Sequence, residues 1–336
     1  MRVFLLCLVA IGGFAGCCGL PEDSAWKRFE YVDPEMGVDF HLKFYAPDQA
    51  AAERIARQAY ARVEQLNGIF SDYEPGSELN RLCHRPAGQP VKVSHELFDI
   101  LQRAQKLARE TDGAFDITAG PMIRLWRTAR RQQKLPAVEA LTTMKSRVGF
   151  EKIILNKQQR TVTLMAEKMQ LDLGGIAKGY AVDEAMKILK ANCIHRAFVA
   201  ASGDMLTAAP PLGRPGWRVE IRNVDQFGNL YPRTVHLKHQ ALSTSGDTEQ
   251  FVEINGQRYS HIVDPRTGHG LTSRIQVTVV SEVSTKSDSH ATALSVLGLK
   301  AGLNFAKQNQ VAVLILELKG KTPHIAFSDQ WLWWER

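Results

Sequence analysis

The spacing of apolar residues predicts two clear amphipathic helices in the first third of the chain. Between residues 50 and 70, apolar side chains recur every three or four positions, as they do on one buried face of a helix. This face consists of Ile55, Ala59, Val63, Leu66 and Phe70. A second helix is predicted after Ser94, a good N-cap residue, and its apolar face runs from Leu97 to Leu107.

Alternation of apolar and polar residues predicts strands along the rest of the chain. Residues 38–44 alternate as a half-buried strand does, directly after a possible turn at Met36-Gly37. Shorter apolar or alternating runs predict further strands at residues 152–155, 161–164, 197–200, 217–221, 235–237, 251–254, 275–280 and 311–316.

The most informative stretch is Leu171-Asp172-Leu173-Gly174-Gly175-Ile176-Ala177-Lys178-Gly179-Tyr180. An apolar run with one acid leads into glycines and then into a helical pattern, which predicts a strand, a glycine turn and a helix. Glycines let backbone N–H groups approach a ligand, and a helix N-terminus favours anions, so a phosphate or pyrophosphate is the expected ligand. The spacing fits neither the P-loop nor the dinucleotide pattern. A structural turn whose glycines need positive φ is the alternative.

Residues 1–17 are predicted to be a secretory signal. Arg2 precedes an apolar run, and small residues lead up to Cys17. This ending resembles a bacterial lipobox, in which Cys17 would be lipidated and become the mature N-terminus. Cleavage of an ordinary signal near Ala15 or Gly16 is the alternative. Residues 18–35 are interpreted as a tether, and no other run reaches the length needed to span a membrane.

Composition predicts a globular protein with a mild positive charge. The 336 residues are 44% hydrophobic and 23% charged, with a net charge of +7, which suits a dianionic substrate. The basic cluster between Arg124 and Lys134 is interpreted mostly as a solvated helix face, so nucleic-acid binding is not predicted. Cys17 and Cys18 lie at the processing site, and only Cys83 and Cys193 remain in the body of the chain, without a C-x-x-C pair, so neither a zinc site nor a disulfide framework is expected. Whether these two cysteines pair is left open.

Three further segments carry candidate chemistry. The glycine-rich loop at residues 111–121 is either a ligand loop with an exposed aromatic residue or a plain connection between helices. In the segment 260–268, His261 and Asp264 are an odd number of residues apart, and a structural histidine is favoured from spacing alone. Asp288 and Thr292 are four residues apart and share a helix face, so they form a hard-oxygen pair suited to Mg²⁺. An N-cap with a buried threonine is the alternative there.

Taken in order, these motifs resemble one family, the FAD:protein FMN transferases, also called ApbE or flavin transferases. The matching pieces span nearly the whole mature chain. They are Met36-Gly37, Ser71-x-Tyr73-x-Pro75-x-Ser77-Glu78-Leu79-x-Arg81-Leu82, Gly113-Ala114-Phe115-Asp116, the glycine stretch 171–181, Ser243-Thr244-Ser245-Gly246-Asp247, His261-Ile262-x-Asp264-Pro265-x-Thr267-Gly268 and Asp288-x-x-x-Thr292-Ala293.

The resemblance implies an α+β fold related to the T-fold, with mixed or antiparallel sheets and packed helices in one catalytic unit, residues 36–336. It implies Mg²⁺-dependent cleavage of FAD, transfer of FMN to a Thr or Ser hydroxyl of an acceptor protein, and release of AMP. The implied metal ligands are the backbone carbonyl of Ala177 and the side chains of Asp288 and Thr292. The implied FAD contacts are Met36, Tyr73, Ala114, Phe115, Asp116, Asp172, Gly174, Lys178 and Ile262. The implied catalytic residues are His261 and Asp288.

Further implications concern partners and location. Acceptors of this family carry an Asp-x-x-Ser/Thr-Gly-Ala-Ser/Thr pattern, and many members are lipoproteins on the periplasmic side of a membrane. The sequence departs from the family at Cys83, at the turn 201–204 and at Thr285, where Asn, Gly-Gly and an acid, respectively, occur in members. Two alternatives stay open: an FAD pyrophosphatase that releases FMN and AMP, and a non-catalytic FAD-binding lipoprotein.

Overall fold

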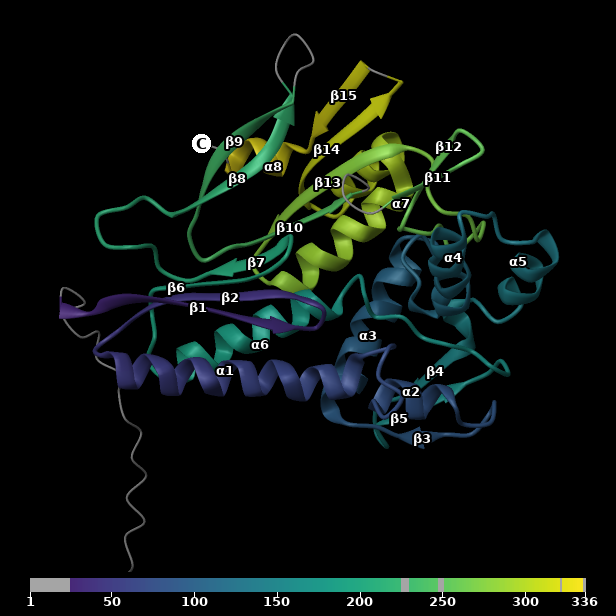
Figure 1. Cartoon of the computed structure of the whole chain (residues 1–336), viewed down its shortest axis with the longest axis horizontal. Coiled ribbons are helices and arrows are strands. Elements are labelled where there is room, and N and C mark those ends of the chain that lie inside the picture. The colour runs from purple at the N-terminus through teal and green to yellow at the C-terminus, as the bar shows by residue number, and fades with distance from the viewer. Residues whose placement is uncertain (1–24, 225–229, 247–250, 321, 335–336) are drawn as a thin grey trace, which may run out of the picture.

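The computed structural model describes residues 25–224, 230–246, 251–320 and 322–334 (Figure 1). The predicted signal, Cys17 and the first part of the predicted tether lie outside these residues. Within them, every helix is too short or too polar to cross a lipid bilayer.

An eight-stranded antiparallel sheet forms the centre of the molecule. Each neighbouring pair in the order β1-β2-β6-β7-β10-β13-β14-β15 is antiparallel. The strands are β1 (Lys27–Glu35), β2 (Val38–Ala46), β6 (Ala197–Ala201), β7 (Asp204–Thr207), β10 (Ala241–Gly246), β13 (Arg274–Ser281), β14 (Ala312–Lys319) and β15 (Thr322–Phe327).

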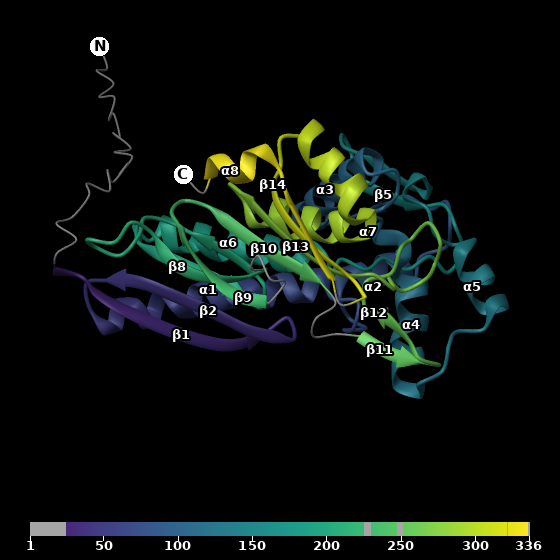
Figure 2. The same cartoon turned by 90° about the horizontal axis from the view of Figure 1, so that it is seen from above.

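Different elements cover the two faces of this sheet, because successive side chains of a strand point to opposite faces. Val277 and Val279 belong to the main core, which also contains the buried faces of the helices α1 (Gln49–Phe70), α6 (Ala177–Ala191) and α7 (Ser284–Gln308). Val280 belongs to a second core, which contains the hairpin β8 (Trp217–Val224) and β9 (Leu230–Leu237) and the helix α8 (Asp329–Trp334). In Figure 1, α1 lies below strands β1 and β2 and the hairpin lies above them; Figure 2 shows the same elements from above.

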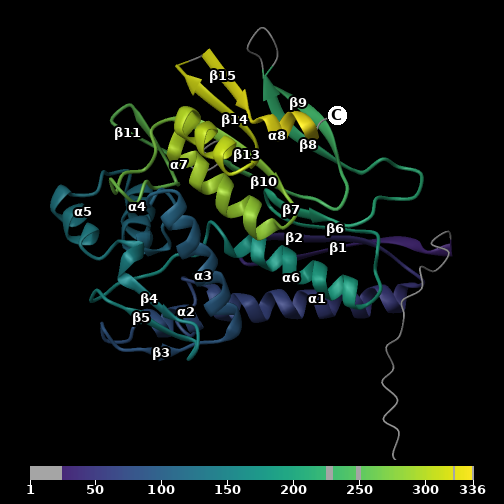
Figure 3. The same ribbon diagram turned by 180° about the vertical axis from the view of Figure 1, so that it is seen from behind.

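A helical lobe lies at one end of the sheet, on the left in Figure 3. Its helices are α2 (Glu78–Cys83), α3 (His95–Glu110), α4 (Gly120–Gln132) and α5 (Val138–Lys145), with short 3-10 turns at Ile117–Ala119 and Phe150–Lys152. A small sheet orders β3 (Val91–Lys92), β5 (Thr161–Leu164) and β4 (Ile153–Asn156), and a separate hairpin joins β11 (Phe251–Ile254) to β12 (Gln257–Ser260). The loop from α3 to α4 and the glycine stretch therefore meet between this lobe and the central sheet.

The α+β fold inferred from the sequence is confirmed, with two local corrections. Strand β1 occupies residues 27–35, which the sequence analysis assigned to the tether; this edge strand is mostly exposed and so lacks the alternation that marks a half-buried strand. The predicted strand before Gly174 is also wrong. Leu171 and Leu173 are buried in an irregular segment, where Asp172 N–H donates to Ile117 O at 2.8 Å.

The cysteine pairing that the sequence left open is not made. Cys83 is a free thiol, so it forms no disulfide with Cys193. Its sulfur accepts a hydrogen bond from the Leu171 N–H at 3.3 Å, behind the glycine stretch.

Candidate active site

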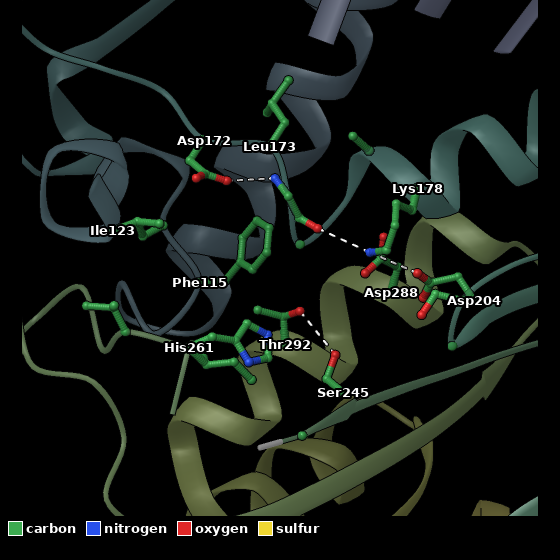
Figure 4. Close-up of a pocket in the computed structure, with 18 of the residues that line it drawn as sticks. Phe115, Ile123, Asp172, Leu173, Lys178, Asp204, Ser245, His261, Asp288 and Thr292 are labelled. Carbon is green, nitrogen blue, oxygen red and sulfur yellow. Dashed lines mark hydrogen bonds and ion pairs between the residues drawn. The ribbon is translucent and has the colours of Figure 1, made fainter. Parts of the chain in front are cut away.

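A cavity of about 840 Å³ lies where α6, α7, the loop before α4 and the ends of the central strands meet. Every residue that the family resemblance implied for FAD, metal or catalysis lines this one cavity. They are Met36, Tyr73, Ala114, Phe115, Asp116, Asp172, Gly174, Ala177, Lys178, His261, Ile262, Asp288 and Thr292. Residues far apart in the sequence are thus brought to one place, as Figure 4 shows for the labelled side chains.

The glycines of the central stretch allow close approach between α6 and α7. A Cβ on Gly175 would lie 3.1 Å from the Thr292 hydroxyl, and one on Gly179 would lie 2.4 Å from the Ser284 carbonyl oxygen. None of Gly174, Gly175 and Gly179 has positive φ, so the alternative of a turn that needs left-handed glycines is wrong. The glycines instead make room for the second helix.

Each of these two helices has a carboxylate that accepts backbone N–H groups at the start of the other helix. Asp288 of α7 accepts the Gly179 N–H of α6 at 2.9 Å, and Asp183 of α6 accepts the N–H groups of Ser284 and Thr285 at 2.7 and 2.8 Å. Backbone N–H groups in the first turn of a helix lack intrahelical partners, so each carboxylate satisfies groups of the other helix. The N-cap alternative for Asp288 is wrong as stated, because α7 begins at Ser284 with Val283 at its N-cap position.

A lysine and two buried acids form a charged cluster beside this contact. Lys178 Nζ lies 3.0 Å from Asp204 Oδ2 and 3.3 Å from the Gly174 carbonyl oxygen (Figure 4). Burial alone would lower the pKa of Lys178, but the carboxylates of Asp204 and Asp288 raise it above its ordinary value. Burial, followed by repulsion from Asp204, raises the pKa of Asp288. The two carboxylates therefore keep the Lys178 ammonium protonated at the cavity wall.

Sequence reasoning did not find Asp204. It noted only that the turn at residues 201–204 departs from the family pattern, whereas the structure places Ser202, Gly203 and Asp204 in the cavity lining. Only the departure from the family pattern drew attention to this turn. The ion pair between Asp204 and Lys178 became visible only in the structure.

The oxygen donors at the cavity suit a small hard cation. Asp288 offers a carboxylate and Thr292 a hydroxyl one helical turn further on, and Ala177 lines the same wall. The Thr292 hydroxyl lies 3.3 Å from that of Ser245. In the part of the chain that the structure describes, no group of three His, Cys, Asp or Glu side chains could hold a metal. A site made from one carboxylate, one hydroxyl and one carbonyl fits Mg²⁺, which keeps several of its waters.

The interpretation of the basic cluster as a solvated face is wrong for Arg127 of α4, which is paired with two acids at the cavity. Its guanidinium contacts Asp72 at 2.5 Å and Asp172 at 2.7 Å and lies 4.5 Å from the centre of the Tyr73 ring. Arg130 also lines the cavity, and Arg124 donates to the Asp72 carbonyl.

The two aromatic residues assigned to FAD differ in their surroundings. Tyr73 is 71% exposed, whereas Phe115 is only 4% exposed and contributes to the main core. The exposed aromatic expected in the 111–121 loop is therefore buried, although its ring points into the cavity (Figure 4). Asp116 follows it and accepts both the N–H and the hydroxyl of Thr118, and burial raises its pKa.

His261 reaches the cavity, whereas Asp264 does not line it. The Asp264 carboxylate is bound on both oxygens by the Arg266 guanidinium at 2.9 Å. His261 and Thr292 line the same cavity, and both are labelled in Figure 4. A purely structural histidine was favoured from spacing alone, but the position of His261 in the lining keeps it as a candidate for proton transfer.

Comparison with known proteins identifies the class of protein. The family model described as "ApbE family" matches residues 36–315, so the chain belongs to the ApbE family, and it is an enzyme.

Several relatives carry the same name. A protein of Vibrio cholerae named FAD:protein FMN transferase is 29% identical over 322 residues, with 94% of each chain covered. One of Treponema pallidum with that name is 29% identical and covers 88% of this chain and 84% of its own. Among solved structures, the flavin transferase ApbE from Vibrio cholerae has a TM-score of 0.85 at 27% identity, covering 92% of this chain and 99% of that one. The ApbE protein from Thermotoga maritima has a TM-score of 0.81 at 26% identity, covering 92% of this chain and 100% of that one.

Proposed function

We propose that this protein is an Mg²⁺-dependent FAD:protein FMN transferase that attaches FMN to a Thr or Ser hydroxyl of an acceptor flavoprotein and releases AMP. The observation that carries the proposal is the convergence of Lys178, His261, Asp288 and Thr292 on one cavity. The names of the relatives support the same activity.

The proposed reaction exchanges the phosphoanhydride bond of FAD for a phosphoester bond to the acceptor. The acceptor oxygen forms a bond to the phosphorus on the riboflavin side of FAD, the bond to the bridging oxygen breaks, and AMP leaves with that oxygen. Negative charge moves onto the leaving AMP, so fixed positive groups near the pyrophosphate stabilise the transition state. Lys178 is such a group, since two carboxylates keep it protonated inside the cavity.

Three oxygen donors would hold Mg²⁺ in this proposal: the Ala177 carbonyl, the Asp288 carboxylate and the Thr292 hydroxyl. When bound, the ion neutralises pyrophosphate charge. Asp288 stays oriented through its hydrogen bond with the Gly179 N–H, and Thr292 through its contact with Ser245. Both side chains are therefore fixed on the cavity wall before substrate arrives.

His261 is the proposed general base. It would take the proton of the acceptor hydroxyl as the new bond to phosphorus forms, and it lines the same cavity as Lys178 and Thr292 (Figure 4). Phe115 and Tyr73 provide the apolar and aromatic surfaces on which the flat rings of FAD would pack.

The test is to mix the protein with FAD, Mg²⁺ and a domain that carries the Asp-x-x-Ser/Thr-Gly-Ala-Ser/Thr pattern. Transfer is expected to add the mass of FMN to that domain and to release AMP. A control domain has the acceptor hydroxyl replaced by a methyl group. Release of AMP and free FMN regardless of the hydroxyl would instead indicate an FAD pyrophosphatase, and tight FAD binding without AMP a non-catalytic binder.

We further propose that the protein is a lipoprotein anchored on the periplasmic side of a membrane through Cys17. The small residues directly before Cys17, after the apolar run, support this proposal. Mass spectrometry of the mature N-terminus from the membrane fraction tests it. A mature chain with an unmodified Cys17, or one that starts elsewhere, would contradict it.

A further inference from the structure

We infer that Arg127 is a positioning residue for FAD: it ties the loop that carries Tyr73 to the glycine turn that leads into α6 and Lys178. The inference rests on the proposed function, because FAD is the ligand whose affinity it concerns. Arg127 lies on α4, whose basic residues were interpreted from the sequence mostly as a solvated face.

Arg127 joins three segments that are distant in the sequence. From α4, one guanidinium nitrogen contacts Asp72 and another contacts Asp172, at 2.5 and 2.7 Å. The flat guanidinium also lies over the Tyr73 ring, 4.5 Å from its centre. Arginine suits this arrangement because its planar fork can bridge two carboxylates while its face stacks on an aromatic ring.

The contact with Asp172 extends across the cavity wall to the charged cluster. The second oxygen of Asp172 accepts the Gly174 N–H at 2.8 Å, and the Gly174 carbonyl accepts Lys178 Nζ at 3.3 Å. Lys178 in turn pairs with Asp204 at 3.0 Å, and Figure 4 shows this path from Asp172 to Asp204. Arg127 thus fixes one end of a chain of contacts whose other end is the proposed phosphate-binding ammonium.

Arg127 also offsets part of the negative charge of two acids that would otherwise oppose an anionic ligand. The side chains of Asp72 and Asp172 are only 10% and 6% exposed. Burial and the nearby Asp72 raise the pKa of Asp172, and Arg127 acts in the opposite direction. Removing the guanidinium would leave two poorly solvated carboxylates at a cavity that has to accept a pyrophosphate.

The chain offers a matched control in Arg62. It also bridges two carboxylates, Glu96 at 2.9 Å and Glu184 at 2.6 Å, and its side chain is 19% exposed compared with 24% for Arg127. Arg62 ties α1 to α3 and α6 and does not line the cavity. Loss of either arginine therefore removes the same kind of structural link, but only one of the two links belongs to the site.

The experiment measures FAD affinity by flavin fluorescence, together with kcat and KM for AMP release. Arg127→Ala is expected to weaken FAD binding at least 10-fold, while kcat falls less than threefold because Lys178 keeps its ion pair with Asp204. Arg62→Ala is expected to keep FAD affinity within twofold, even where its melting temperature falls. Arg127→Lys, which keeps a charge but cannot bridge both acids in the same way, is expected to lie between the parent and Arg127→Ala, and it serves if Arg127→Ala does not fold.

The decisive measurement is the effect of Asp72→Asn on FAD affinity, made once with Arg127 present and once in Arg127→Ala. This effect is expected to differ at least threefold between the two backgrounds, because Arg127 and Asp72 form one link. An equal effect in both backgrounds would show that Arg127 acts without Asp72, and the positioning role would be wrong. Unchanged affinity in Arg127→Ala, or an equal loss in Arg62→Ala, would also overturn it.

These outcomes are separate from those for the proposed function. A parent protein that binds FAD but transfers no FMN refutes the proposed transferase activity, while the affinity pattern still decides the role of Arg127. A parent protein that does not bind FAD refutes both.

Discussion

Replacing Gly179 with alanine tests whether close contact between α6 and α7 is needed for activity. The added Cβ would lie 2.4 Å from the Ser284 carbonyl oxygen and 2.8 Å from the Asp288 Cβ. Real Cβ atoms do not approach other atoms this closely, so the two helix starts would have to move apart. That movement would stretch the bond from the Gly179 N–H to the Asp288 carboxylate, now 2.9 Å.

The expected change in the free energy of unfolding of Gly179→Ala is the sum of opposing terms. Alanine favours a helix interior over glycine by about 1 kcal/mol. Overpacking a close contact costs about 1–3 kcal/mol, and weakening a hydrogen bond to a charged group costs about 1.5–3 kcal/mol more. The free energy of unfolding is therefore expected to fall by roughly 1.5–5 kcal/mol from these terms. Displacing Asp288 by about 1 Å is expected to slow AMP release on the order of 10²-fold.

Gly68→Ala is the matched control. Gly68 also lies inside a helix, α1, but an added Cβ there would have no atom within 4 Å. This change is expected to raise the free energy of unfolding by about 0.4–1 kcal/mol and to leave AMP release unchanged. Thermal unfolding and AMP release are measured on both variants. If Gly179→Ala is as stable as Gly68→Ala and cleaves FAD at the parent rate, the helix contact does not position Asp288.

Three further outcomes are expected. Asp288→Ala should reduce AMP release by at least ~10²-fold while FAD still binds, because it removes a carboxylate that would hold Mg²⁺ at the pyrophosphate; AMP release at the parent rate in a destabilised variant would show a structural role only. Phe115→Leu should weaken FAD binding by about 1–3 kcal/mol through lost ring stacking, with a smaller effect on melting because an apolar side chain still fills the core; calorimetric titration against FAD measures this, and an unchanged affinity would exclude stacking. Burial raises the pKa of the Cys83 thiol to about 11, so the thiol stays protonated at pH 8 and should resist iodoacetamide until the protein unfolds; peptide mapping that finds rapid alkylation of the folded protein would contradict this.

Local patterns predicted those parts of the fold that local physics determines. The Ser94 side chain accepts the Leu97 N–H at 3.1 Å, as the N-cap pattern indicated, and α1 buries the predicted apolar face. The cavity residues were reached through motifs, since a glycine stretch, an acid and a hydroxyl each leave a signal along the chain. Their convergence was implied only by the family resemblance.

The missed features depend on partners distant in the sequence. Arg127 reads as an exposed arginine on a polar helix until Asp72 and Asp172 are placed against it, 55 and 45 residues away. The place of Asp204 in the site could not be inferred from the sequence, because its ion pair with Lys178 forms only in the folded chain. Strand β1 was missed because it lies at an edge of the sheet, where few of its side chains are buried, and so its sequence lacks alternation.

The exchange of carboxylates between α6 and α7 limits how this enzyme can be recombined with its relatives. Asp183 and Gly179 belong to one helix, and Ser284 and Asp288 to another about 100 residues later. A chimera whose crossover falls between them takes the two helix starts from different parents, so the carboxylate of one parent has to fit the N–H groups of the other. Swapping both helices as one unit keeps the two contacts matched. Libraries built from family members should therefore retain activity more often when both segments come from the same parent.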